Sequence, residues 1–244
     1  MSLSKNNTKL ITSLQQKKYR QKHNLFVAEG IKVVQELLNS SLNCRALYTT
    51  DADLEWASNI AVSLISEADL KKVSSLKSPN KVLALFEIPE APTSVSNDLT
   101  VVLDGINDPG NLGTIIRLCD WFGVGQLLCS KNTVDCYNSK VIQATMGSIT
   151  RVNIQYTDLV SFLESTAQPV YIADMDGTNV YTAELPTNGV LVMGNEANGV
   201  SDAVRTCVDR VLSIPRFGSL QKTESLNVAT ATAILLSEFR RGLK

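Results

Sequence analysis

The sequence has few aromatic residues, a single histidine and no long apolar run, and the last two shortages each exclude a class of protein. A Ser-His-Asp triad, a HExxH zinc site and a Cys-His pair each need a histidine at the chemistry. The only one, His23, lies in a basic, polar stretch where we expect a surface residue. No run approaches the roughly 20 apolar residues of a membrane span, and the N-terminus lacks the apolar segment of a secretory signal. We therefore expect a cytoplasmic protein without a membrane partner.

Cysteines are odd in number, scattered and without a CxxC pair, so neither a disulfide framework nor a zinc site is indicated. We expect buried free thiols and no metal. The five positions are Cys44, Cys119, Cys129, Cys136 and Cys207.

The sequence has no large excess of charge of either sign, because 23 Lys and Arg against 24 Asp and Glu leave a net charge of −1. A polyanionic partner must therefore meet a local basic patch. One such patch runs from Lys5 to Lys22, before the first acidic residue, Glu29. Leu10 and Leu14 follow a helical period there, so they can face a core while the lysines remain in water. A solvated helix face without a partner is the alternative.

A proline-containing stretch at residues 88–100 has no apolar periodicity and reads as a linker. We place a boundary near residues 89–98, with domains at residues 1–92 and 93–244. Beyond it, apolar strands alternate with amphipathic helices, which predicts an α/β fold with a mostly parallel sheet covered on both faces.

Three loops of the second domain carry polar residues where ligands collect in such a sheet, beyond the carboxyl ends of the strands. The first follows a strand that ends at Asp104 and leads into a helix that Asp108 or Asn111 could cap. The second, GNEANGVS, begins like a phosphate-binding loop but lacks the Lys-Ser/Thr pair, and neither loop gives GxGxxG. These departures argue against an ATPase and a dinucleotide-dependent oxidoreductase. The third contains Ser225 and Asn227 at the start of an apolar helix that must be buried.

The segments NDPGNLGTIIRLCDWFGV, LVMGNEANGVS and IPRFG with ESLNVATATAI resemble, in order and spacing, the three motifs of the SpoU/TrmH family of RNA ribose 2′-O-methyltransferases. The stretch KKYRQKHNLFVAEGIKVVQELL is similar to the substrate-binding domain often fused before such enzymes. The third motif departs from the family's usual IPM at Arg216 and is longer before Ser225, and we expect cofactor binding to survive this change.

The resemblance implies a C-terminal α/β knot, a trefoil-knotted and mostly parallel sheet flanked by helices, preceded by a small α/β domain similar to RNA-binding ribosomal proteins. It implies a homodimer that transfers a methyl group from S-adenosylmethionine to a ribose 2′-hydroxyl of structured RNA, rRNA before tRNA. A non-catalytic RNA-binding ribosome-assembly factor of the same fold is the alternative.

The resemblance also implies roles for individual residues. Arg117 matches the arginine that engages the target ribose or its phosphate, and a guanidinium that stays protonated suits such a clamp better than a free base. The catalytic candidates are Asn107, Arg117, Glu196, Ser225 and Asn227. The cofactor candidates are Met175, Gly194, Ile214, Ser225, Leu226 and Asn227. The RNA-binding candidates are Lys17, Lys18, Arg20, Lys22 and Arg117.

Overall fold

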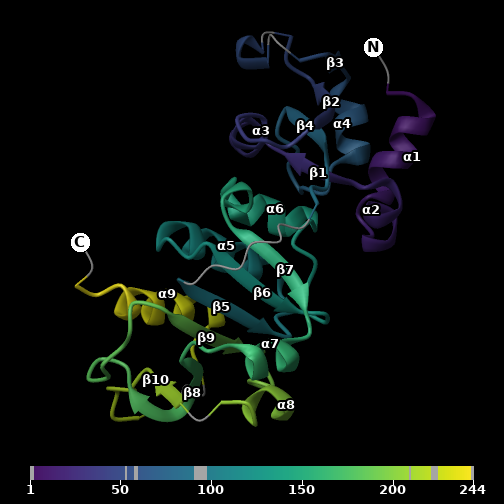
Figure 1. The fold of residues 1–244 in the computed structure, drawn as a ribbon. Helices are drawn as coiled ribbons and strands as arrows, with labels where there is room; N and C mark the ends of the chain where they lie inside the picture. The colour runs from purple at the N-terminus through teal and green to yellow at the C-terminus, as the bar shows by residue number, and fades with distance from the viewer. Residues whose placement is uncertain are drawn as a thin grey trace. The chain divides into compact units, whose positions relative to one another are not determined.

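The chain forms two compact units, each described here by itself. The computed structural model describes residues 3–52, 54–57, 60–90, 98–208, 210–220 and 225–242. The first unit comprises residues 1–90 and 135–150, and the second comprises residues 91–134 and 151–244 (Figure 1). Most of the predicted boundary at residues 89–98 lies outside the described residues, so the division into 1–92 and 93–244 stays a prediction.

A four-stranded mixed sheet forms the centre of the first unit. Its strands, in spatial order, are β1 (Leu25–Glu29), β4 (Val82–Glu87), β2 (Cys44–Thr49) and β3 (Val62–Leu64). The first three pair antiparallel, and β3 pairs parallel with β2. Its helices are α1 (Lys5–Ser13), α2 (Lys17–His23), α3 (Ile31–Leu38), α4 (Glu67–Val73) and α6 (Ser139–Thr145), with 3-10 turns η1 (Glu55–Ala57) and η2 (Ser148–Thr150).

Period-two alternation sorts the strand residues of this sheet between two packed faces. Val27, Leu83 and Leu85 pack in one cluster with apolar residues of α1 and α4. The amphipathic helix α3 contacts β1 and β4 and buries Val33, Val34 and Leu37, while Leu38 is half-buried. Figure 1 shows α3 on one side of the strands and α1 with α4 on the other.

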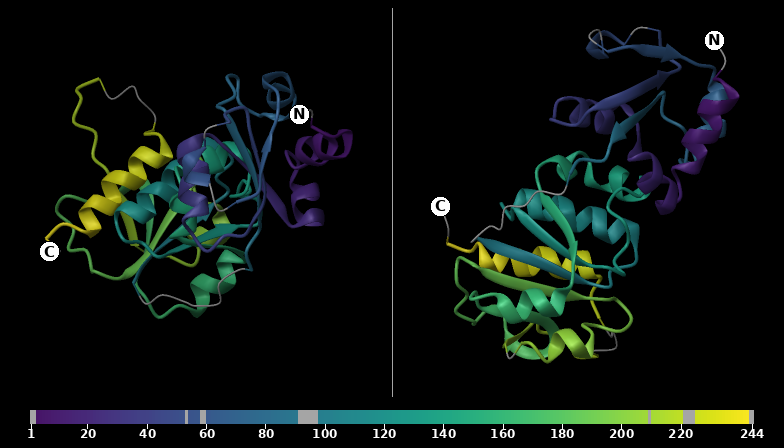
Figure 2. Two further views of the ribbon diagram at one scale, coloured as in Figure 1. Left: turned by 90° about the horizontal axis from the view of Figure 1, so that it is seen from above. Right: turned by 45° about the vertical axis from the view of Figure 1, so that its right-hand side comes forward.

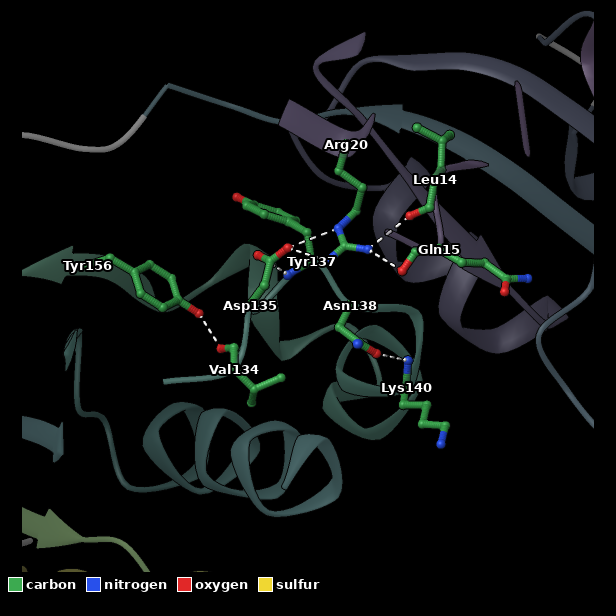
Figure 3. A network of polar contacts seen from close by, with 9 residues as sticks. All are labelled: Leu14, Gln15, Arg20, Val134, Asp135, Tyr137, Asn138, Lys140 and Tyr156. Carbon is green, nitrogen blue, oxygen red and sulfur yellow. Dashed lines mark hydrogen bonds and ion pairs between the residues drawn. The ribbon is translucent and has the colours of Figure 1, made fainter. Parts of the chain in front are cut away.

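The basic N-terminal stretch folds as two helices, because Arg20 turns back and binds the chain between them. Arg20 is only 2% exposed, and its guanidinium donates to the carbonyl oxygens of Leu14 at 2.9 Å and Gln15 at 3.0 Å. The same guanidinium forms a two-pronged ion pair with Asp135, with Nε at 2.9 Å from Oδ2 (Figure 3). The prediction that Arg20 binds RNA is therefore wrong, since its donors are buried and already used.

Asp135 begins the segment by which the middle of the chain joins the first unit. Its Oδ1 accepts the backbone N–H of Tyr137 at 3.1 Å, and the Tyr137 ring lies 4.9 Å from that of Phe26 in β1. Burial raises the pKa of the Tyr137 phenol, so the ring stays neutral. The preceding residue, Val134, is bound within the second unit by Ile106 and by the Tyr156 hydroxyl.

The second unit is built on a six-stranded, fully parallel sheet, as the strand and helix alternation predicts. Its strands, in spatial order, are β10 (Arg210–Ser213), β8 (Val170–Asn179), β9 (Gly189–Gly194), β5 (Leu99–Asp104), β6 (Gln126–Ser130) and β7 (Asn153–Thr157). Its helices are α5 (Pro109–Trp121), α7 (Leu159–Ser165), α8 (Asp202–Arg205) and α9 (Val228–Phe239). The pairings β5 with β6, β5 with β9 and β8 with β9 are all parallel.

Helices cover both faces of this sheet (Figure 2). Val102, Ile172 and Val192 pack with apolar residues of α7 and α8 on one face. Their strand neighbours Val101 and Leu103 are fully buried on the other face, where α5 and α9 contact each other. None of the described helices combines the length and apolar character that a bilayer crossing requires.

Three of the five cysteines are buried free thiols, as predicted, and the other two, Cys44 and Cys207, are half-buried. Burial raises the pKa of the Cys119 thiol well above its usual range. That thiol is therefore protonated and unreactive at neutral pH.

The ion pair between Arg20 and Asp135 predicts a large loss of stability when one partner is removed. Their side chains are 3% and 14% exposed, so Asp135→Ala leaves a buried guanidinium without its counter-charge. We expect the free energy of unfolding to fall by about 3 kcal/mol. Urea unfolding followed by tryptophan fluorescence in a Trp121→Phe background reports this, because Trp56 then supplies the only indole signal and lies in the first unit.

Arg45→Ala is the matched control, since its pair with Glu87 is long at 3.5 Å and the Arg45 side chain is 62% exposed. Its removal should cost less than about 1 kcal/mol. Equal small losses in the two variants would contradict the anchoring role of Asp135.

Candidate active site

The order of the parallel strands places a ligand crevice between β5 and β9. From β5 the chain moves outward through β6 and β7. It then crosses to the other side of β5 and forms β8, β9 and β10, of which β9 lies next to β5. Ligands of open α/β sheets bind beyond the carboxyl ends of the strands at such a reversal of order. The loops that follow β5 and β9 begin at Gly105 and Asn195, which are the first and second loops of the sequence analysis.

Two hydrogen bonds join these loops at the strand ends. The Asn195 side-chain amide donates to the carbonyl oxygen of Gly105 at 2.6 Å, and the Asp104 carboxylate accepts the backbone N–H of Ser201 at 2.8 Å. Asp104 is only 7% exposed. The two loops therefore form one structure although more than 80 residues separate them in the sequence.

A chain of side-chain amides connects both loops to the third. Asn227 caps α9, since its Oδ1 accepts the backbone N–H groups of Ala229 at 3.0 Å and Thr230 at 3.2 Å. Its Nδ2 donates to Oδ1 of Asn111 at 2.8 Å, and Nδ2 of Asn111 donates to Oε1 of Glu196 at 2.6 Å. The helix N–H groups require the side-chain oxygen of Asn227, so its NH₂ group points to the side-chain oxygen of Asn111. The NH₂ group of Asn111 is then left to donate to Glu196. We call Asn111, Glu196 and Asn227 the amide chain.

Asn111 was not predicted as a site residue, whereas Asn107 was. Asn107 is exposed, and its side chain makes no hydrogen bond within the described part of the molecule. Asp108 caps α5, since its Oδ1 accepts the backbone N–H of Asn111 at 2.8 Å, and this cap directs the first turn of the helix toward the loops. Its place in the first turn of a helix that follows a strand end is the sequence signal that indicates Asn111 as a site residue.

Gly194 is required by a close approach of the second loop to the end of β9. A Cβ at this position would lie 2.3 Å from the carbonyl carbon of Gly199 and 2.3 Å from the nitrogen of Val200. The loop folds back through paired backbone hydrogen bonds between Asn195 and Gly199 at 2.8 and 2.9 Å. No side chain fits between the strand end and the returning loop.

Exposed apolar side chains lie at the loops next to this edge. Strand β8 is in register with β10 up to Ile172, which also pairs with Val192 of β9. Residues 173–177 then form a bulge, and pairing with β10 resumes at Thr178. Met175 lies in this bulge and is 52% exposed, and Leu226, just before α9, is 48% exposed. Ile214, the residue after β10, is half-buried. Solvent-exposed apolar groups beside a polar crevice are typical of a ligand site.

The remaining candidates lie apart from the amide chain. Arg117 is exposed on α5, six residues and thus about 9 Å of helix beyond Asn111. Ser225 is exposed two residues before the cap of α9, and the neighbouring residues 221–224 lie outside the described residues. Arg216, where the third motif departs from the family, is exposed.

In the first unit, Lys17, Lys18 and Lys22 are exposed on α2 together with His23, as predicted. Lys18 also lies over the ring of Tyr19, with Nζ 4.8 Å from the ring centre. Among the residues that the structure describes, no group of three or more His, Cys, Asp or Glu could hold a metal ion.

Comparisons with known proteins match both units. A model of the SpoU rRNA Methylase family matches residues 98–237, and a model of the MRM3-like substrate binding domain matches residues 5–84. Among curated proteins, the 23S rRNA guanosine 2′-O-methyltransferase RlmP of Bacillus subtilis is 31% identical over 237 residues, which cover 93% of each chain.

Solved structures agree along nearly the whole chain. A TrmH-family protein from Porphyromonas gingivalis has a TM-score of 0.88 and is 39% identical, with 99% of each chain covered. An rRNA methyltransferase from Sinorhizobium meliloti, solved with bound S-adenosylmethionine, has a TM-score of 0.86 and is 29% identical, with 100% of this chain and 97% of that chain covered. The chain belongs to the SpoU rRNA methylase family.

Proposed function

We propose that this protein transfers a methyl group from S-adenosylmethionine to a ribose 2′-hydroxyl of ribosomal RNA. The amide chain carries the proposal, because it brings one residue from each of the three motif loops to a single crevice. Family membership and the activities by which the relatives are named, 23S rRNA or rRNA methyltransferase, support rRNA as the substrate.

The residues at the crevice fit S-adenosylmethionine. A methionine chain and an adenine ring need apolar contact, which Met175 and Leu226 offer with their exposed side chains, and Ile214 lies at the same edge. The missing side chain of Gly194 lets the backbone of Gly199 and Val200 pack against the end of β9, and we propose that this backbone contacts the cofactor. We propose that Ser225 and Asn227 complete this set at the start of α9.

S-adenosylmethionine supplies an electrophilic methyl group on a sulfonium, so the chain's main task is to orient the acceptor hydroxyl and assist loss of its proton. We propose that the Arg117 guanidinium clamps the target ribose or its phosphate, since it is exposed and permanently charged. Glu196 acts as a positioning residue, because its Oε1 is bound by Asn111. The amide chain keeps the three loops in register while substrate binds.

The finer features of the enzyme are part of the same proposal. Family membership supports a trefoil knot in the second unit and a homodimer. The exposed indole of Trp121, 83% accessible at the end of α5, is a suitable contact for a second copy. An rRNA substrate supports action in the cytoplasm. We retain residues 1–92 as the substrate-binding domain and 93–244 as the methyltransferase domain, next to the family matches at 5–84 and 98–237.

Methyl transfer to unmodified 23S rRNA transcripts tests the activity directly. We expect incorporation of labelled methyl groups into one nucleotide whose 3′ linkage resists alkaline cleavage, because a methylated 2′-oxygen cannot attack the phosphate. Binding of the transcripts without methyl incorporation would favour the non-catalytic ribosome-assembly factor.

Gly194→Ala should weaken S-adenosylmethionine binding by at least about tenfold, because the new methyl group would displace the loop from residues 195 to 200. Isothermal titration calorimetry measures this. Gly125→Ala is the control, since a Cβ there meets nothing within 4 Å, and its affinity should equal that of the wild type. Unchanged affinity in Gly194→Ala would place the cofactor elsewhere.

Arg117→Ala should lower kcat/KM for methyl transfer by about 100-fold, the effect of removing one positioned donor, while the Kd for S-adenosylmethionine stays within about twofold. Arg241→Ala removes another exposed arginine, paired with Glu238 at the end of α9, and should leave methyl transfer unchanged. A loss of cofactor affinity in Arg117→Ala would reject the role of Arg117 as an RNA clamp.

Replacing Lys17, Lys18 and Lys22 together by Gln should flatten the salt dependence of RNA binding. If each lysine contacts one phosphate, the slope of log K against log salt decreases by about 2, at about 0.7 per contact. Filter binding across a salt series measures the slope. Replacing Lys5 and Lys9 of α1 in the same way gives the comparison, and equal slopes in the wild type and the triple variant would reject α2 as an RNA contact.

A further inference from the structure

A hollow of about 450 Å³ opens in the first unit beside α3. Six of its lining residues come from three elements: Lys32, Gln35, Glu36 and Asn39 from α3 and its cap, Trp56 from η1, and Met146 from the end of α6. All of them belong to the first unit, whereas the amide chain belongs to the second. The hollow and the amide chain therefore share no residue.

The helix α3 presents four polar side chains to this hollow, and Leu38 at its end is the one apolar residue of the helix in the lining. Lining positions 32, 35, 36 and 39 follow the spacing i, i+3, i+4 and i+7, which is one face of a helix. Val33, Val34 and Leu37 on the other face are buried in the core. Polar helix faces ordinarily meet open water, but this one meets an indole and a thioether.

The turn that carries the Met146 thioether has a strained backbone. Met146 adopts a left-handed conformation with φ 51°, which residues other than Gly, Asn and Asp seldom adopt. The next residue, Gly147, has φ 95°, and a Cβ there would lie 2.6 Å from Cβ of Glu36. The turn is thus pressed against α3, and Met146 remains 36% exposed at the hollow. Strain of this kind is concentrated at binding sites.

These groups match the chemistry of an unstacked nucleobase. Proteins read single-stranded RNA by stacking bases on aromatic rings and by hydrogen bonds to the base edges. Trp56 offers the ring, and the amides of Gln35 and Asn39 offer both donors and acceptors. Lys32 adds a positive charge for the attached phosphate. The volume lies within the range of about 300–1,000 Å³ that small-molecule sites occupy.

We propose that this hollow binds one unstacked nucleotide of the RNA substrate, with its base against Trp56 and its edge read by Gln35 and Asn39. The proposal rests on the RNA-directed function and deepens it, because it assigns the first unit a site for a base in addition to phosphate contacts. It gives the enzyme a means of recognising a nucleotide with a residue set separate from the one that binds the methylated ribose.

Tryptophan fluorescence tests base binding without any methyl transfer. In the Trp121→Phe variant Trp56 is the only indole, so its emission reports the hollow. The probes are AMP, GMP, CMP and UMP, with ribose 5-phosphate as the matched ligand that has no base. We expect saturable quenching by at least one nucleotide and none by ribose 5-phosphate. Absence of quenching by all four nucleotides, or equal quenching by the sugar phosphate, overturns the proposal.

Substitutions link the hollow to RNA. Trp56→Ala should weaken binding of the rRNA transcript about 5- to 100-fold, and Trp56→Phe should restore most of it, because a phenyl ring still stacks. The double variant Gln35→Ala and Asn39→Ala keeps the indole and should weaken quenching by nucleotides at least fivefold. Lys71→Ala, an exposed position on α4, is the control for a surface change in the same unit. Wild-type affinity in both hollow variants overturns the proposal.

Methyl transfer by the wild type, measured in parallel, separates the two proposals. If the wild type methylates rRNA and the hollow variants bind it as tightly as Lys71→Ala does, the hollow proposal fails and the enzyme function stands. If nucleotides quench Trp56 but no methyl group is transferred, the enzyme function fails and base binding stands.

Discussion

The candidate site depends on the Asn227 side-chain amide, which caps α9 with its oxygen and binds Asn111 with its nitrogen. Its oxygen satisfies the first N–H groups of α9, and its nitrogen begins the chain through Asn111 to Glu196. Because α9 is apolar and buries Leu235 and Leu236, core packing sets where that amide lies. The geometry of the amide chain therefore depends on the packing of a hydrophobic helix.

Much of this arrangement was predictable, because its causes are local. The strand that ends at Asp104 and the alternation beyond it follow from apolar periodicity, and the parallel sheet follows from both. Asn227 lies at a helix start where capping residues are expected, and it caps α9. Apolar periodicity does not indicate which polar loops bind the same ligand, and the three family motifs supplied that prediction.

The failures share a cause, since each involves partners far apart in the chain. Arg20 looks like its exposed neighbours Lys18 and Lys22 in sequence, but a carboxylate 115 residues away buries it. Asn111 looks like a capping residue until the fold brings it to Glu196, 85 residues on. A pattern of one or two helical turns carries no information about such contacts.

The discontinuous first unit also sets an order of events on the ribosome. Strand β1 contacts α6, and Phe26 packs on Tyr137, so the N-terminal unit lacks part of its packing until residue 150 has been made. At about 5–20 residues per second, the 60 residues between positions 90 and 150 take roughly 3–12 s to synthesise. During that interval an exposed β1 edge must avoid other chains. The packing of this unit is therefore completed only after residues 135–150 have followed residues 1–90 from the ribosome.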